Sequence, residues 1–182
     1  MKLLKQSLIT LFLVLYSFIG YGQVTDHWET VVYNTDQWSY FVGNSEPNVN
    51  WANPSFNAST WPKGSGGIGY EDEDDNTIIS QTRSLYIRTN FTLVDVSVIK
   101  YFVLHADYDD AFVAYLNGTE IARNNIGNVG VRPSYNTYAD TYHEANLYQG
   151  GLPEDFIFNE AELKSLLNLS LIHISEPTRP SK

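Results

Sequence analysis

The sequence contains no cysteine and a single methionine, and its basic residues are few. The absence of cysteine excludes a disulfide framework, thiolate zinc sites and CxxC redox chemistry. The 182 residues include 11 Lys and Arg against 21 Asp and Glu, a net charge of −10. Such a balance disfavours a phosphate-binding surface, so we expect no nucleic acid partner. The sequence also has no GxSxG or HExxH motif, which removes two common hydrolase signatures.

The residues that are present favour an all-β fold. Aromatic residues make up 14% of the chain, and short apolar runs are separated by Gly, Asn, Pro and Asp. Asn117-Gly118 supplies the two positive-φ positions of a type I′ turn, so the flanking segments 111–116 and 119–122 are predicted to form a hairpin. Asn159 is predicted to cap one short helix that ends near Leu167. Further strands are predicted at 30–33, 38–42, 84–93, 99–107 and 156–158, and together they indicate a single antiparallel β-sandwich.

The N-terminal segment 1–22 has the features of a secretory signal peptide. Lys2 and Lys5 precede an apolar run over 8–19, and Gly20 and Gly22 provide small residues at the −3 and −1 positions. The apolar run is too short to remain as a stable membrane anchor. We therefore expect cleavage before Gln23 and an extracytoplasmic mature protein.

The C-terminal segment 169–182 contains a sequence typical of an artificial oligonucleotide rather than of a protein domain. Residues 169–179 read LSLIHISEPTR, which a fixed transposase sequencing adapter encodes in order. This match predicts a non-native tail. The natural domain is then expected over 23–168 as an incomplete sandwich, truncated at its C-terminal end.

Five consecutive carboxylates over 71–75 form the densest polar cluster. They repel one another unless they are solvated or neutralised by a cation, and Ca²⁺ takes six to eight oxygen ligands. The glycine and glutamate of an EF-hand loop are missing from this spacing. A solvated acidic loop and a structural Ca²⁺ site both stay open, and the candidate ligands are Asp72, Asp74, Asp75 and Asn76.

A second polar cluster begins at His105 and continues through Asp107 and Asp109. On a strand these alternate residues share one face, as in a small metal site or an acid–base pair. Asp residues between two strands also cap turns through their own backbone. The cluster raises the alternative of a secreted metal-dependent hydrolase that uses Asp107, Asp109 and His143.

Four large aromatic rings precede the glycine-rich stretch 64–69. Exposed rings on loops can stack on sugar faces. Phe56 and Trp61 are expected in the core, and Trp38 belongs to a predicted strand. Trp51 is open between core and surface, and it is the candidate carbohydrate contact.

Several of these motifs together resemble the galactose-binding-domain-like jelly roll of large secreted bacterial proteins. They include Gly67-Ile68-Gly69-Tyr70, LYIRTNF over 85–91 and DYDDAFVAYLNG over 107–118. Proteins with such modules often carry a spore-coat-protein-H-like kinase domain and a lamin-tail domain. The resemblance implies a jelly roll in which Asn117 and Gly118 are fold residues, and it maps no sugar-binding set onto this sequence.

The leading hypothesis is therefore a non-catalytic accessory module of a longer secreted protein. It would bind a polysaccharide or cell-surface glycan, or act as a spacer between other domains. No catalytic residues are predicted under this hypothesis, and Ca²⁺ is the one cofactor considered.

Overall fold

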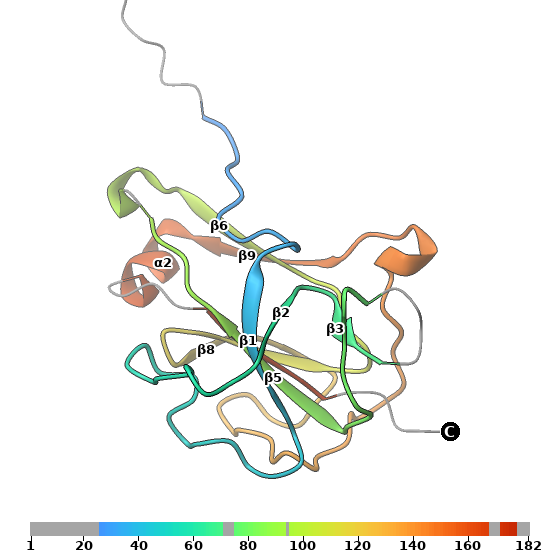
Figure 1. The fold of residues 1–182 in the computed structure, drawn as a ribbon. Helices are drawn as coiled ribbons and strands as arrows, with labels where there is room; N and C mark the ends of the chain where they lie inside the picture. The colour runs from blue at the N-terminus through green and yellow to red at the C-terminus, as the bar shows by residue number, and fades with distance from the viewer. Residues whose placement is uncertain (1–25, 71–74, 94, 168–171, 178–182) are drawn as a thin grey trace, which may run out of the picture. The chain divides into compact units, whose positions relative to one another are not determined.

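The computed structural model describes residues 26–70, 75–93, 95–167 and the backbone of 172–177 (Figure 1). The predicted signal peptide lies outside the described residues. The chain divides into two units, 1–30 and 31–182. Residues 26–30 are the described part of the first unit and have no regular secondary structure. The strands, the helix and the cavity described below all lie within residues 31–182.

The second unit is an all-β sandwich, as the sequence predicts. In its described part there are two 3₁₀ turns and one α-helix besides the strands. The strands are β1 Gln37–Val42, β2 Lys63–Ser65, β3 Ile68–Gly69, β4 Thr77–Ile78, β5 Ser84–Thr89, β6 Tyr101–Ala106, β7 Phe112–Leu116, β8 Thr119–Asn124, β9 Glu154–Asn159 and β10 Ile172–Pro177. The helix is α2 Glu160–Leu166, and the 3₁₀ turns are Val96–Val98 and Leu147–Gln149. No helix within the described ranges is long and apolar enough to cross a membrane.

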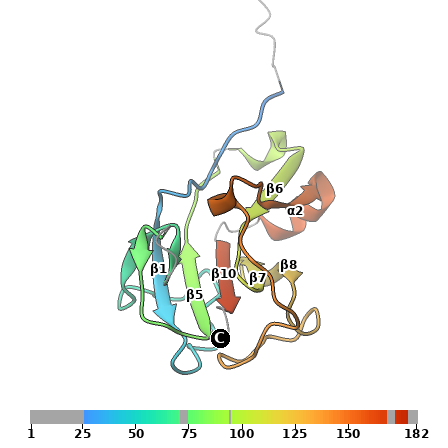
Figure 2. The ribbon, with the colours of Figure 1, turned by 90° about the vertical axis from the view of Figure 1, so that its right-hand side faces the viewer.

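A six-stranded sheet in the order β2-β1-β5-β10-β7-β8 forms the larger layer (Figure 2). All of its strand pairs are antiparallel. β6 and β9 form a separate antiparallel pair, and β3 and β4 form a short parallel pair. Apolar residues of β6 and β9, with those of α2, pack against one face of the large sheet.

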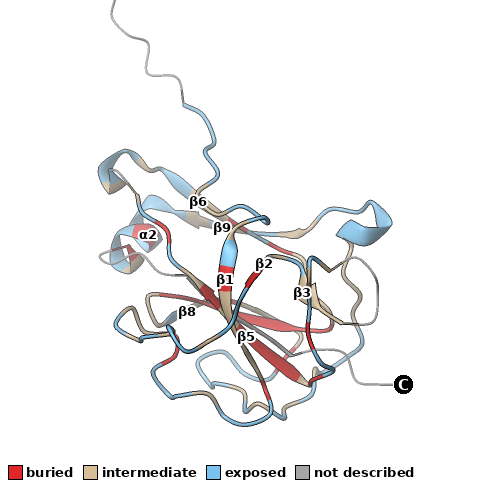
Figure 3. Ribbon diagram, viewed as in Figure 1, coloured by how far each residue is buried: buried red, intermediate tan, exposed pale blue. Residues whose placement is uncertain are grey.

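The large sheet is covered on both faces, and β7 shows this most clearly. All five of its residues are buried. Burial is also high along β5 of the same sheet, drawn mostly in red in Figure 3. Phe112 packs toward the β6–β9 pair, whereas Val113 and Tyr115 pack with Trp51 in a second cluster. Side chains alternate between the faces of a strand, so burial of every residue requires cover on both sides. The second cover consists of loop segments that contribute Trp51, Trp61 and Ile126, among others.

The two strongest local predictions are confirmed. Asn117 and Gly118 have φ angles of 54° and 83° and join β7 to β8. Asn159 caps α2, with its side chain accepting from the backbone of Ala161 and Glu162 while Glu162 accepts from the Asn159 N–H. Both features depend on residues adjacent in sequence.

Other predictions need correction. No strand forms over 30–33, where Val31 and Val32 instead pack against the cluster below α2. Strand β5 ends at Thr89 and does not continue to Leu93. Alternation with the apolar Leu85 and Ile87 predicts that Arg88 faces solvent. Arg88 is instead buried, because loop residues cover that face of the sheet.

The segment read from sequence as a non-native tail contributes β10. Its backbone pairs antiparallel with β5 on one side and with β7 on the other. The match to an adapter predicts a tail that packs poorly or that docks opportunistically through residues 171–174, and the backbone of 172–177 is docked in the large sheet. Ladder hydrogen bonds do not depend on side-chain identity, and Pro177 stands last in the strand, where a missing N–H is tolerated. The origin of the segment stays a prediction.

Candidate functional site

An open cavity of about 380 Å³ lies over the β1–β5 side of the large sheet. Its size falls in the range typical of small-ligand sites. Most of the lining side chains are polar, and the set combines three amides, three hydroxyls, two cations and one aromatic ring. The lining residues are Gln37, Ser39, Phe56, Asn57, Ala58, Ser59, Lys63, Arg88, Thr89 and Asn90.

A tight turn over 57–61 shapes one wall of the cavity. The Asn57 side-chain oxygen accepts the Ser59 N–H at 2.9 Å, and the Ala58 carbonyl accepts the Trp61 N–H at 3.0 Å. The Phe56 and Trp61 rings meet edge to face with centroids 5.4 Å apart. Their contact anchors the turn to the aromatic cluster, so the wall is held by core packing as well as by local hydrogen bonds.

Arg88 connects this wall to the sheet. The side chain is 5% exposed, and its Nη1 donates to the Trp51 carbonyl at 3.0 Å. Nη2 lies 3.5 Å from the Asn53 carbonyl, and the guanidinium lies 5.2 Å from the centroid of the Phe56 ring. Burial lowers the pKa of Arg88 from its usual value, because desolvation disfavours the charged form.

Lys63, Ser39 and Arg88 form one row across three strands. Ser39 of β1 is directly opposite Lys63 of β2 and Arg88 of β5 in the antiparallel registers. Directly opposed residues of antiparallel strands point to the same face of the sheet. The row thus places a hydroxyl between two cationic side chains on the floor of the cavity.

Trp51 requires a correction. The ring is completely buried, with a T-shaped contact to Tyr86 at 5.2 Å and another to Tyr115 at 5.7 Å between ring centroids. A ring without accessible surface has no face to offer a sugar. Trp51 is therefore a residue of the second core cluster and not a surface on which a sugar could stack. Phe56 and Trp61, both predicted as core residues, are half-buried and pack against the edge of the same cluster, and Phe56 also lines the cavity.

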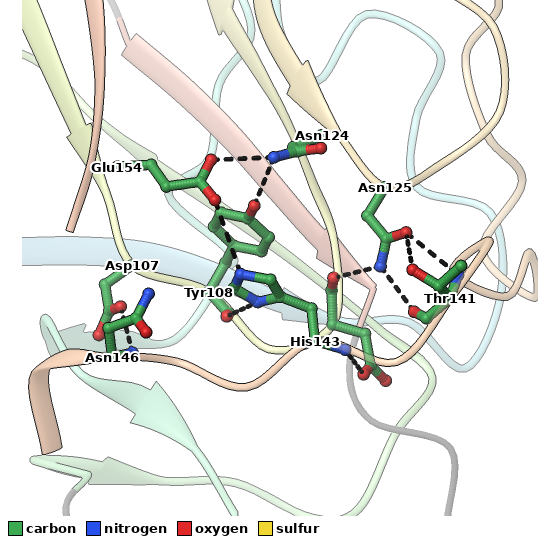
Figure 4. A network of polar contacts seen from close by, with 9 residues as sticks. Asp107, Tyr108, Asn124, Asn125, Thr141, His143, Asn146 and Glu154 are labelled. Carbon is green, nitrogen blue, oxygen red and sulfur yellow. Dashed lines mark hydrogen bonds and ion pairs between the residues drawn. The ribbon is translucent and has the colours of Figure 1, made fainter. Parts of the chain in front are cut away.

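Asp107 of the second polar cluster and the nearby Asp110 belong to a network of polar contacts that fixes the segment 141–147 (Figure 4). Asp110 accepts the His143 backbone N–H at 2.9 Å. Asp107 accepts the N–H groups of Asn146 and Leu147 at 2.7 and 3.1 Å. These two carboxylates therefore hold backbone, as Asp residues at strand ends commonly do.

Tyr108 and His143 form the centre of this network. Their rings stack with centroids 4.3 Å apart, and His143 Nδ1 lies 3.1 Å from the Tyr108 carbonyl. Glu154 lies 3.6 Å from His143 Nε2. The pKa of Tyr108 is raised, first by burial and then by its hydrogen bond to Glu154.

The metal-dependent hydrolase alternative requires several His, Asp or Glu side chains that can bind one metal ion together. Within residues 26–70, 75–93 and 95–167, no three His, Asp or Glu side chains are arranged to hold a metal ion. The structure does bring Asp107 and His143 into the same network. His105 instead contacts Asp155 across β6 and β9, with Nδ1 and Oδ1 2.6 Å apart.

The acidic loop is described only in part. Asp72 and Asp74 lie outside the described residues. Asn76 donates its side-chain amide to the Gly66 carbonyl at 2.7 Å, which ties the loop to the glycine-rich stretch. The Asp75 carboxyl lies against Gly69, where a Cβ would be 2.5 Å from its Oδ2. Calcium binding by this loop stays a prediction.

The cavity residues were missed by sequence reasoning because three distant segments supply them. Of the lining residues, Phe56 is the one for which the sequence predicts a role, and that role is in the core. The one usable signal was the polar sequence Asn57-Ala58-Ser59 directly after an aromatic residue, which resembles any surface turn.

Comparison with known proteins supports the fold. No protein-family model matches the chain, and no curated protein sequence is significantly similar to it. Among solved structures, a Bacteroides uniformis β-glucuronidase 2 covalently bound to cyclophellitol-6-carboxylate aziridine is similar over 82% of this chain. The identity is 13% and the TM-score 0.50. A β-glucuronidase from glycoside hydrolase family 2 is similar over 88% of this chain, at 17% identity and a TM-score of 0.51. The match spans 15% of the length of each of these two proteins.

Proposed function

We propose that this domain is a non-catalytic accessory module of a longer secreted protein, and that it binds carbohydrate in the cavity beside β1 and β5. The cavity carries the proposal: amide and hydroxyl side chains converge there next to an aromatic ring. Sugars present hydroxyl groups and apolar ring faces, and such a lining matches both. The fold similarity to parts of two β-glucuronidases is consistent with a carbohydrate-related role.

The test is binding of the purified protein to a panel of soluble polysaccharides by affinity electrophoresis, followed by calorimetry on oligosaccharide fragments. In the double variant Gln37→Ala/Asn90→Ala, two cavity amides are lost from exposed positions. Each hydrogen bond contributes about 1 kcal/mol, so binding should weaken about tenfold or more. The variant Gln149→Ala/Asn128→Ala makes the same chemical change away from the cavity and should bind normally. Absence of binding to every polysaccharide would leave the spacer role.

Secretion rests on the N-terminal sequence alone. Expression of the full chain in a bacterial host, followed by N-terminal sequencing of the exported protein, should give Gln23 as the first residue. A protein that retains Met1 in the cytoplasm would contradict this part of the proposal.

The proposed lack of catalysis also has a direct test. The protein is incubated with chromogenic glycosides, with and without divalent metal ions. Turnover that is lost in Asp107→Asn and His143→Gln, with both variants still folded, would favour the hydrolase alternative.

A further inference from the structure

The lining of the cavity is positively charged, whereas the protein as a whole is acidic. Among the described residues that line the cavity there are two cations, Lys63 and Arg88, and no carboxylate. The whole chain, by contrast, has nearly two acidic residues for each basic one. We propose that the cavity recognises a sugar that carries an acidic group, a carboxylate or a sulfate ester, through Lys63 and Arg88. This inference rests on the proposed carbohydrate-binding function and specifies its ligand class.

Arg88 supplies the first reason. Its hydrogen-bond partners are the neutral carbonyls of Trp51 and Asn53, and the Phe56 ring lies beside its guanidinium. Within the described residues no carboxylate pairs with it, although the side chain is almost fully buried. A buried charge is stabilised when it is paired, and a guanidinium has five N–H donors, of which these two contacts use two. An anion in the cavity would supply the missing counter-charge.

Lys63 supplies the second reason. It is exposed on β2, and it forms no ion pair with any residue that the structure describes. Other basic side chains are used differently: Arg123 pairs with Glu120, and Lys164 pairs with Glu160. Lys63 is thus an exposed positive charge among the residues that line the cavity, without an ion-pair partner in the described part of the chain.

The row Lys63–Ser39–Arg88 supplies the third reason. Adjacent strands lie about 4.8 Å apart, so the two cationic residues are separated by about 10 Å across Ser39. A monosaccharide unit fits over this row. Its acidic group can face one cation while a hydroxyl group meets Ser39, and the Asn57 and Asn90 amides border the same space.

The net charge of −10 also predicts which kind of acidic ligand the protein prefers. The protein as a whole repels dense polyanions, and this repulsion extends over about 8 Å at physiological ionic strength. The local pair of cations therefore favours a short or sparsely charged acidic oligosaccharide over a heavily sulfated polymer.

The experiment compares an acidic trisaccharide with its neutral ester and with two other anions. Calorimetry with the purified protein uses trigalacturonate, its fully methyl-esterified form, a trisaccharide of neutral sugars that carries one sulfate ester, and sodium acetate as a free carboxylate. We expect the acid to bind at least tenfold more tightly than the ester, and acetate alone not to bind at millimolar concentration. Lys63→Gln should weaken binding of the acid about threefold and leave the ester unchanged, as for loss of an exposed ion pair. Lys164→Gln removes the same charge from α2 and should bind like the unmodified protein.

The outcomes separate the two proposals. Preference for the carboxylated or the sulfated sugar, reduced in Lys63→Gln, supports acidic-sugar recognition and identifies which acidic group is preferred. Equal binding of acid and ester, or binding of neutral polysaccharides only, overturns this inference and leaves carbohydrate binding intact. Acetate binding as tightly as trigalacturonate overturns the sugar requirement. No binding of any sugar refutes both proposals.

Discussion

Replacement of Arg88 by methionine tests whether the cavity wall is held to the sheet as described. The substitution removes the guanidinium and keeps a long, flexible apolar side chain in the same space. It eliminates the 3.0 Å hydrogen bond to the Trp51 carbonyl, the longer contact to Asn53 and the cationic contact with the Phe56 ring. The segment that carries these residues would then be held by its ring packing alone.

The expected loss of stability follows from these contacts. A hydrogen bond from a charged donor to a buried carbonyl contributes about 1.5–3 kcal/mol. The cation–π contact adds about 0.5–1 kcal/mol, and the 3.5 Å contact adds little at that length. Removal of a desolvated charge offsets part of the loss. The net effect is a decrease of about 2 kcal/mol in the free energy of unfolding, or about 4–8 °C in melting temperature for a domain of this size.

Thermal and urea unfolding followed by tryptophan fluorescence measure this effect, because Trp51 and Trp61 lie in the affected cluster. Arg132→Met is the matched control. Arg132 is exposed; it donates to the carbonyl of Val49, and its guanidinium lies 5.9 and 5.4 Å from the ring centroids of Trp51 and Tyr115. Its replacement therefore removes ring contacts of the same kind but no buried hydrogen bond, so the loss should be about 1 kcal/mol, half of that expected for Arg88→Met. If Arg88→Met is no less stable than Arg132→Met, then Arg88 does not hold the wall and the description is wrong.

Two further predictions concern the β7–β8 hairpin. Glu120 accepts two hydrogen bonds from Arg123, at 2.8 and 2.9 Å, and this contact lowers the pKa of Glu120. Glu120→Gln should therefore cost about 2 kcal/mol near pH 7 in urea unfolding. Because the pKa of Glu120 is lower in the folded protein than its unfolded value of about 4.3, the ion pair stabilises the fold above that pH, and this stabilisation is lost as the pH falls through the folded-state pKa. The difference in free energy of unfolding between the unmodified protein and Glu120→Gln should therefore shrink below about pH 4.3. A difference that stays constant from pH 7 to 3 would contradict the ion pair. Gly118→Ala places a Cβ at φ +83°, 2.7 Å from the Asn53 side-chain oxygen, and should cost about 1–2 kcal/mol, whereas unchanged stability would refute the type I′ turn.

The features that sequence predicts here are local. The Asn117-Gly118 turn and the Asn159 cap follow from the backbone preferences of adjacent residues, and both form as expected. The large sheet's second covered face was not predictable in this way. Alternation along β5 identifies Leu85 as buried, but it cannot indicate that a loop lies over Tyr86 and Arg88.

The cavity, like the second covered face of the sheet, could not be predicted from local sequence patterns. Its floor comes from β1 and β5, and its wall comes from a turn about thirty residues away from Arg88. Only the register of β1 with β2 and β5 aligns Lys63, Ser39 and Arg88. The sequence drew attention to Trp51 because tryptophan is a common sugar platform, but the same large apolar ring is also favoured in a core.

The central claim is that carbohydrate binds in this cavity. The most direct measurement is a ¹⁵N NMR titration that follows side-chain amide signals while an acidic trisaccharide is added. We expect the signals of Gln37, Asn57 and Asn90 to shift together and to saturate at one dissociation constant. Shifts confined to Asn124, Asn125 and Asn146 would place binding at the Tyr108–His143 network instead, and they would contradict the account.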